Sequence, residues 1–259
     1  MGDQIPMLAT VTAVRLLTPR MARITVVSDE LQRFGYDGPD QLVRIFVPNG
    51  ITDELTLPVT TAWWPELNEM PEASRPVLRN YTVRRLDRAS GELDIDFVLH
   101  GHGATAGPGS SWAGQARPGD KIGLLSDGAD YLPPVDTEWV LLVGDESALP
   151  AIAVILEQSP DDLPVVTLLE VEDASDELPL AGSGSVQWLH RGSGPRNEIA
   201  LSTLRSMDLP GGTPYVWTAG EAGLATGVRR HLVGERGISK DRIYFCGYWR
   251  AAAAEPDDQ

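Results

Sequence analysis

The run Arg79-Asn80-Tyr81-Thr82-Val83-Arg84 brings together three side chains that can hold a flavin. A guanidinium such as that of Arg79 can bind a phosphate through paired, charge-assisted hydrogen bonds. Alternate residues of an extended chain point the same way, so Tyr81 lies on the Arg79 side and can stack on an isoalloxazine ring. The Thr82 hydroxyl can donate or accept a hydrogen bond near the reactive nitrogen of a flavin. Tyr81 and Thr82 are therefore candidate catalytic residues, although the run also fits an ordinary strand edge.

Two glycine-containing segments could approach phosphates. In GPGSSWA (107–113), the small residues Gly109 and Ser110 let backbone N–H groups come close to a pyrophosphate. The alternative is a plain loop that enters a helix capped by serine. In GDESALP (144–150), Gly144 gives a sharp turn, and Ser147 with neighbouring amides can face a nucleotide phosphate. The alternative there is a helix N-cap run, Asp-Glu-Ser.

These segments are placed by two different patterns of secondary structure. The first half predicts strands at 10–17, 21–27, 42–48, 77–85, 93–100 and 121–125, which favours a small antiparallel barrel. Its segment 49–75 is long for a loop, so we expect it to be functional or poorly ordered. The second half alternates strands at 138–144, 163–171, 185–190, 213–218 and 242–246 with helices at 148–158, 198–206 and 224–235. This alternation predicts a mainly parallel sheet.

We therefore predict an antiparallel β-barrel domain over 1–133 and an α/β nucleotide-binding domain over 134–250. The acidic end, 251–259, is predicted to be disordered. The segment GDESALP follows an apolar strand, and ligands bind at the carboxyl ends of strands in open parallel sheets. Arg191 follows another strand and is a candidate contact for a 2′-phosphate, or else a surface arginine. The acidic runs 161–162 and 170–177 are predicted to be solvated loops.

Seven segments occur in an order that resembles one known family. They are RNYTVR (79–84), FVLHG (97–101), GPGSSWA (107–113), ARPGDKIGLL (116–125), LLVGDESALPAI (141–152), WTAGEA (217–222) and IYFCGYWR (243–250). The chain is identified by them as a member of the siderophore-interacting proteins, FAD-dependent ferric-siderophore reductases of the ferredoxin-NADP reductase-like group. The resemblance extends over about residues 8 to 250.

The resemblance implies an FAD barrel followed by an NAD(P)H-binding domain, and it implies roles for particular residues. The implied cofactor-binding residues are Arg79, Tyr81, Thr82, Phe97, Val98, His100, Gly109, Ser110, Gly144, Asp145, Ser147, Arg191, Gly220 and Glu221. The implied substrate-binding residues are Arg44, Tyr248, Trp249 and Arg250. The expected donor is NADPH or NADH. Two alternatives stay open, namely a reductase fed by ferredoxin and a flavoprotein that holds siderophore without turnover.

Composition limits the partners. The formal net charge is −16 with only two lysines, which disfavours nucleic acid and anionic membranes and favours a hydroxamate over a trianionic catecholate siderophore. No apolar run approaches the ~20 residues that span a bilayer, and we expect no secretory signal and a cytoplasmic monomer. Cys246 is alone, and His100 and His102 lack a third ligand, so no protein-bound metal is predicted.

Overall fold

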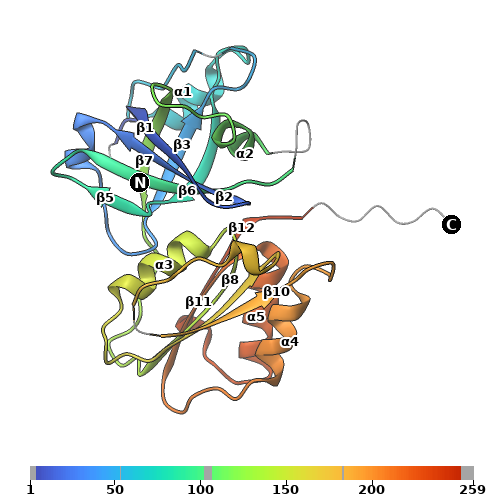
Figure 1. The fold of residues 1–259 in the computed structure, drawn as a ribbon. Helices are drawn as coiled ribbons and strands as arrows, with labels where there is room; N and C mark the ends of the chain where they lie inside the picture. Colours follow the sequence, from blue (N-terminus) through green and yellow to red (C-terminus); the bar gives the residue numbers. More distant parts are fainter. Residues whose placement is uncertain (1–3, 53, 102–106, 183, 252–259) are drawn as a thin grey trace. The chain divides into compact units, whose positions relative to one another are not determined.

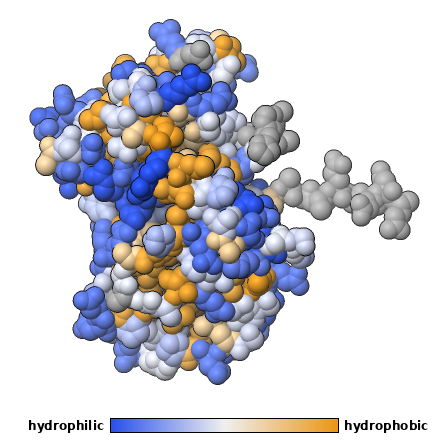
Figure 2. Space-filling model, in the orientation of Figure 1, coloured by the Kyte–Doolittle hydropathy of each residue, from blue (hydrophilic) through white to orange (hydrophobic). Residues whose placement is uncertain are grey.

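The computed structural model describes residues 4–52, 54–101, 107–182 and 184–251. The chain forms two compact units that divide between Tyr131 and Leu132. Each unit is built on its own sheet, seven-stranded in the first and five-stranded in the second (Figure 1). On the face shown in Figure 2, hydrophobic residues are scattered among hydrophilic ones, as is usual for protein surfaces.

The first unit is an antiparallel sheet in the order β4-β3-β7-β1-β2-β6-β5. Its strands are β1 (Met7–Thr18), β2 (Met21–Val27), β3 (Leu42–Val47), β4 (Val77–Thr82), β5 (Arg85–Asp87), β6 (Glu92–Val98) and β7 (Lys121–Gly128). The two edge strands, β4 and β5, are consecutive in the chain. Between them the Val83 N–H donates to the Gln41 carbonyl (2.8 Å) and the Arg84 N–H to the Asp94 carbonyl (2.9 Å). One of these bonds reaches the residue before β3 and the other reaches β6, so the two edges of the sheet meet here. The sheet therefore closes into the predicted barrel.

Strand β6 shows why the barrel forms. Leu93, Ile95 and Phe97 alternate along it and lie in the barrel core with no exposed surface. Asp94 and Asp96 point the other way, and both are buried beneath polar partners. The Arg23 guanidinium binds Asp96 through two hydrogen bonds of 2.6 and 2.7 Å, which satisfies the buried carboxylate.

The long segment 49–75 contains a helix that the sequence did not predict, α1 (Trp63–Glu69). Trp63 and Leu67 of this helix form a separate apolar cluster with Phe46 and Leu125, on the barrel strands β3 and β7. The described part of the segment therefore covers one outer face of the barrel. The other helices described in the first unit are short, namely α2 (Pro108–Ala113) and the 3-10 turn Asp29–Arg33.

The second unit is the predicted parallel sheet, in the order β10-β9-β8-β11-β12. Its strands are β8 (Trp139–Asp145), β9 (Val165–Val171), β10 (Ser185–His190), β11 (Pro214–Glu221) and β12 (Ile243–Trp249). Its helices are α3 (Leu149–Gln158), α4 (Glu198–Ser206) and α5 (Ala222–Gly234), with 3-10 turns at Ala174–Asp176 and Lys240–Arg242. Strand β8 is buried throughout, as its continuous apolar sequence predicts. In the described ranges, no helix has the length and apolar character needed to cross a membrane.

Candidate functional site

In the first unit, β4 presents Arg79 and Tyr81 on one side of the chain. Arg79 is exposed, and its Nη1 donates to the carbonyl of its neighbour Leu78 (2.7 Å). Among the described residues no carboxylate pairs with it, so its charge is available to an anion. The Tyr81 ring is half-buried, with its centroid 4.3 Å from that of Phe97. Burial raises the pKa of Tyr81 to about 12, against the opposing charge of Arg79, so the phenol stays neutral near pH 7.

Helix α2 lies against this tyrosine. A Cβ built on Gly109 would come 2.4 Å from the Tyr81 hydroxyl oxygen, so only glycine permits this approach. Ser110 ties the helix to the end of β6, because its hydroxyl receives the His100 N–H (2.9 Å) and donates to the His100 carbonyl (3.1 Å). No side chain caps the start of α2. An uncapped glycine turn, an aromatic ring and a free guanidinium are features that fit a flavin with its phosphates.

Other predicted flavin residues lie nearby in the fold but differ in access. Val98 is half-buried, and the His100 side chain is exposed. Thr82, the last residue of β4, is only 3% exposed. Its hydroxyl is inside the unit in this structure, and the flavin contact expected of it stays a prediction.

Arg44 lies on β3 and already has two partners. Its Nη2 is 2.5 Å from an Asp127 carboxylate oxygen, and its guanidinium carbon lies 5.3 Å from the centre of the Trp63 ring. The ion pair cancels the positive charge expected to attract an anionic siderophore. A substrate contact at Arg44 stays a prediction.

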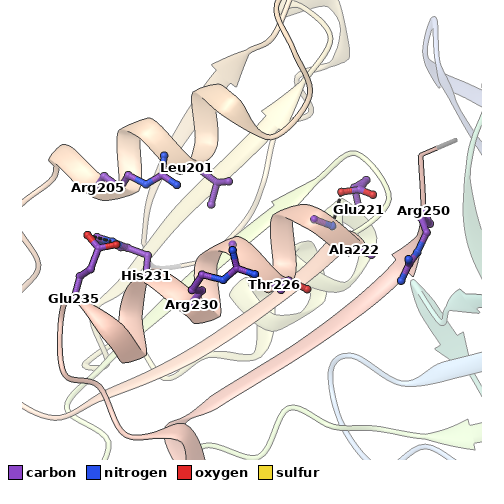
Figure 3. A pocket seen from close by; sticks show the side chains of 11 residues that line it. Leu201, Arg205, Glu221, Ala222, Thr226, Arg230, His231, Glu235 and Arg250 are labelled. Carbon is purple, nitrogen blue, oxygen red and sulfur yellow. Dashed lines mark hydrogen bonds and ion pairs between the residues drawn. The ribbon is translucent and has the colours of Figure 1, made fainter. Parts of the chain in front are cut away.

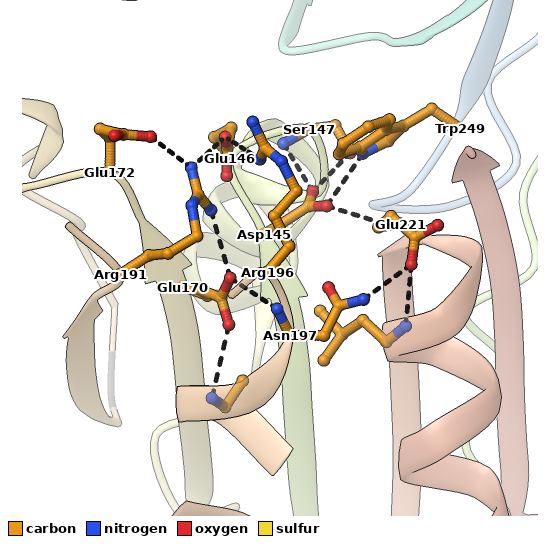
Figure 4. A network of polar contacts seen from close by, with 12 residues as sticks. Asp145, Glu146, Ser147, Glu170, Glu172, Arg191, Arg196, Asn197, Glu221 and Trp249 are labelled. Atoms are coloured by element: carbon orange, nitrogen blue, oxygen red, sulfur yellow. Dashed lines mark hydrogen bonds and ion pairs between the residues drawn. The ribbon is translucent and has the colours of Figure 1, made fainter. Parts of the chain in front are cut away.

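In the second unit, the strand order reverses between β8 and β11, which is where open α/β sheets bind nucleotides. These two strands end at Asp145 and Glu221. The polar side chains around these two carboxylates form one network (Figure 4). The predicted nucleotide site is therefore lined by acids of the chain itself.

Asp145 is the centre of this network and is 2% exposed. One of its oxygens receives the Ser147 N–H (2.9 Å) and hydroxyl (2.6 Å). The other receives the Glu221 N–H (2.7 Å) and the Trp249 indole N–H (2.9 Å). Burial raises the pKa of Asp145, and the charge of Glu146 adds to this, while the hydrogen bonds act in the opposite direction. The amides expected to face a phosphate are thus occupied by an internal carboxylate.

The two predicted glycines at this point make room for neighbours. Gly220 has a φ of +131°, and a Cβ there would lie 2.7 Å from the Asp145 carboxyl carbon. A Cβ on Gly144 would lie 2.6 Å from the Cβ of Ala148, just before α3. Both glycines are therefore required by close packing around β8.

Glu221 caps helix α5. Its carboxylate receives the N–H groups of Gly223 and Leu224, the side-chain amide of Asn197 (2.7 Å) and the N–H of Ala251 (3.2 Å). Burial disfavours ionisation, but these hydrogen bonds outweigh it and lower the pKa of Glu221. Beyond Ala251, the predicted disordered segment lies outside the described residues, as does His102.

Arg191 is buried among acids, and its side chain is 3% exposed. Its guanidinium pairs with Glu172 (2.7 Å), Glu146 (3.2 Å) and Glu170 (3.2 Å). Burial alone would lower the pKa of Arg191, but these carboxylates raise it. Glu170 also receives the Asn197 N–H (2.9 Å) and is 1% exposed. The prediction that the acidic run 170–177 is a solvated loop is therefore wrong for Glu170, which lies within β9.

Arg196 completes what we call the Arg191 cluster, made of Arg191, Arg196, Glu146, Glu170 and Glu172. Arg196 lies 3.5 Å from Glu146, and its guanidinium is 5.1 Å from the centre of the Trp249 ring. Four of these five residues were not predicted from the sequence. For Glu146 and Glu172 the signal was a position just after a strand of a parallel sheet, whereas Glu170 lies within β9 and Arg196 lies before α4. The pairing itself joins residues 19 to 50 apart in sequence.

A groove of about 520 Å³ runs beside α4 and α5, and Glu221 of the network is one of its lining residues (Figure 3). It is lined by Arg205, Arg230 and Arg250, among other residues, and these three guanidinium groups pair with no carboxylate in the described chain. Arg250, predicted to bind substrate, lies near Glu221 at one end. Tyr248 lies edge-on to Trp217, with centroids 6.4 Å apart. Within the described ranges, no group of three metal-binding side chains is arranged to hold an ion.

Comparison with known proteins matches both units. Residues 10–131 match the family "Siderophore-interacting FAD-binding domain", and residues 137–252 match "Siderophore-interacting protein". The chain is 31% identical to the ferric vibriobactin reductase ViuB of Vibrio cholerae, over 96% of this chain and 91% of that protein.

Comparison with solved structures leads to the same family. A siderophore utilization protein from T. fusca superposes with a TM-score of 0.81 at 32% identity, over 99% of this chain and 98% of that one. A ferredoxin NADP+ reductase from Neisseria gonorrhoeae with bound FAD and NADP shares the fold, with a TM-score of 0.64 at 14% identity, over 95% of this chain and 100% of that one. The predicted ferredoxin-NADP reductase-like fold is confirmed, and the chain belongs to the siderophore-interacting protein family.

Proposed function

We propose that this protein is an FAD-dependent ferric-siderophore reductase, with FAD held by residues 1–133 and the electron donor received by residues 134–250. The observation that carries the proposal is the free guanidinium of Arg79 beside the Tyr81 ring and the Gly109 turn. Membership of the siderophore-interacting family and the likeness to a ferric vibriobactin reductase support the reaction. The match to an FAD-binding domain supports the cofactor.

FAD would supply the conversion of a two-electron donor into two one-electron transfers to Fe(III). Arg79 would bind its phosphate, and the neutral Tyr81 ring would stack on its isoalloxazine. Gly109 and Ser110 would lie at its pyrophosphate. Fe(III) reduced to Fe(II) is a poorer match for hard oxygen ligands, so reduction releases the metal from the siderophore.

The donor in this proposal is NADPH or NADH. A bound flavin would take a hydride from the nucleotide, which would leave as NAD(P)+, and solvent would supply the one proton that the reduced flavin also takes up. We infer a cytoplasmic location on this basis, because pyridine nucleotides are available there, and a monomer. Two alternatives are testable, namely reduction by ferredoxin and siderophore binding without turnover.

The substrate we infer is a neutral or cationic ferric hydroxamate. The net charge of −16 disfavours the approach of a trianionic catecholate, and the pairing of Arg44 with Asp127 removes one of the positive charges expected to attract it. Reduced protein should therefore react with a catecholate complex more slowly at low salt, and salt should reduce the difference as it shortens the screening length to about 8–10 Å. A catecholate that reacts faster at low salt, and slows when salt is added, would overturn this preference.

The proposed cofactor is tested by identifying the flavin that the purified protein carries. Purified protein should be yellow, and acid release followed by chromatography should yield FAD, because the GPGSSWA turn is expected at a pyrophosphate that FMN lacks. Recovery of FMN alone, or a folded colourless protein that does not take up FAD, would contradict the assignment.

A further inference from the structure

We propose that the second unit takes the pyridine nucleotide without a 2′-phosphate, NADH, and that the Arg191 cluster rejects NADPH. This inference rests on the proposed function and specifies its electron donor. It concerns the residues at the carboxyl ends of β8, β9 and β10, within one unit of the molecule (Figure 4).

Glu172 and Arg191 lie where the adenosine ribose of a bound nucleotide is expected. A nucleotide at the reversal between β8 and β11 extends outward over the neighbouring strand ends. Enzymes of doubly wound α/β folds place an acid near the end of the second strand to bind the ribose 2′-hydroxyl, or an arginine nearby to bind a 2′-phosphate. Glu172 directly follows β9, the second strand of this unit, and Arg191 directly follows β10.

In this chain the acid neutralises the arginine. Glu172 lies 2.7 Å from the Arg191 guanidinium, and Glu146 and Glu170 fill its other sides. The Arg191 side chain is 3% exposed, whereas that of Glu172 is 35% exposed. The group that a ligand can reach is thus the carboxylate, which accepts hydrogen bonds from a hydroxyl and repels a phosphate.

The local charge points the same way. In the ion pairs of the Arg191 cluster, three carboxylates face two guanidinium groups, and Asp145 lies beside them. Arg196 is 44% exposed, but Glu146 offsets its charge. A 2′-phosphate would add about −1.5 to −2 charges to this surface.

The Arg191 cluster also contains one buried hydrogen-bond acceptor that lacks a partner among the described residues. Oε2 of Glu146 is buried and lacks a hydrogen-bond partner among the described residues. This buried carboxylate oxygen adds negative charge beside Arg191 that no described donor offsets, which disfavours a further anion there. Donors suited to a phosphate lie elsewhere, in the groove lined by Arg205, Arg230 and Arg250.

The experiment compares NADH with NADPH as reductants of the FAD-loaded protein in single-turnover, anaerobic stopped flow. Bleaching of the flavin should be about ten- to hundredfold more efficient with NADH, a ratio that one charge-assisted hydrogen bond can produce. A second readout needs no turnover. In calorimetry, 5′-AMP should bind at least as tightly as 2′,5′-ADP. Faster bleaching by NADPH, or tighter binding of 2′,5′-ADP, would overturn the proposal.

Variants test the residues. The double substitution Glu146→Gln with Glu172→Gln leaves Glu170 as the one carboxylate paired with Arg191 among the described residues, and it should shift the NADPH-to-NADH ratio about tenfold or more toward NADPH. Glu177→Gln is the matched control, because Glu177 pairs with His190 and its substitution removes one nearby charge that does not contact Arg191. An unchanged ratio in the double variant, or an equal shift in the control, would contradict the role of the cluster.

Failure of this inference is distinguishable from failure of the proposed function. Dithionite-reduced protein is mixed with a ferric siderophore, so that no nucleotide takes part. If iron is reduced but the flavin is not bleached by either nucleotide, the reductase proposal stands and the donor inference is wrong. If arginine substitutions at 205 and 230 weaken an NADPH preference, the groove is the phosphate site and the inference is again wrong.

Discussion

Arg79 lies within strand β4 of the first unit, and Arg191 directly follows strand β10 of the second. Both stand at predicted ligand sites, but they differ in exposure and in charged neighbours. Arg79 is exposed and bonds only to a neighbouring carbonyl among the described residues. Arg191 is buried and meets three carboxylates. The free guanidinium can bind a phosphate, whereas the paired one has its charge cancelled by the fold. The same residue type is therefore available to a ligand in one unit and is held by ion pairs in the other.

The largest expected effect is on stability at Arg191. Arg191→Ala leaves Glu170 buried without its charged partner, and breaking a buried pair in this way typically costs about 3–5 kcal/mol of unfolding free energy. Chemical denaturation of the parent and the variant measures it. Arg242→Ala is the control, since its pair with the exposed Asp136 is expected to contribute less than about 1 kcal/mol. If both variants lost the same unfolding free energy, the buried Arg191 ion pairs would contribute no more to stability than the pair of Arg242 with Asp136.

Arg79→Ala should do the reverse, weakening FAD binding while leaving the fold intact. A charged hydrogen bond to phosphate contributes about 1.5–3 kcal/mol, so FAD affinity should fall roughly ten- to hundredfold. The unfolding free energy of the apoprotein should change by less than about 0.5 kcal/mol. Fluorescence titration with FAD measures the first quantity, and the exposed Arg117→Ala serves as the control. Parent-like FAD binding in the Arg79 variant would show that the phosphate is held elsewhere.

Gly109→Ala tests the tyrosine contact. The added Cβ meets the Tyr81 hydroxyl at 2.4 Å, so either the Tyr81 ring, which packs on Phe97, or helix α2 must shift. Overpacking of this kind costs about 1–3 kcal/mol, and we expect FAD affinity to fall about tenfold. The exposed Gly114, at the end of the same helix, provides the control substitution Gly114→Ala. If both variants bind FAD like the parent, the Tyr81–Gly109 contact has no part in the flavin site.

The smallest effect is a pH dependence from Asp145. Its pKa is raised in the folded protein, so its contribution to stability is present below the unfolded value and is lost as pH rises through the folded value. The unfolding free energy of the parent minus that of Asp145→Asn should therefore increase as pH falls from about 7 toward about 4. Denaturant titrations of both proteins at several pH values give this difference. A decrease over the same range would mean that Asp145 is instead held ionised.

The sequence predicted the strands well, because the spacing of apolar residues within a strand shows which of its faces are buried. The alternation in β6 and the apolar run of β8 each reveal which faces are buried. Helix α1 was missed, since it begins without a capping side chain, inside a segment rich in proline and acid. β5 was missed because it has three residues.

The site was less predictable, because charges pair over long sequence distances. Positions after strands marked Asp145, Glu221 and Arg191, but no local pattern indicates that Glu172 and Glu146 neutralise Arg191. Arg191 was expected to be either a phosphate contact or a surface arginine. It is instead a buried arginine paired with carboxylates. Only the three-dimensional structure distinguishes this arrangement from the two that were expected.

Reductase activity itself is decided by one experiment on chemically reduced, FAD-loaded protein. Mixed anaerobically with a ferric hydroxamate siderophore and an Fe(II) chelator, the flavin should be reoxidised and about two Fe(II) chelates should form per flavin, since the flavin stores two electrons. A flavin that stays reduced in the presence of bound ferric siderophore, with no Fe(II) formed, would contradict the reductase and leave a siderophore-binding flavoprotein.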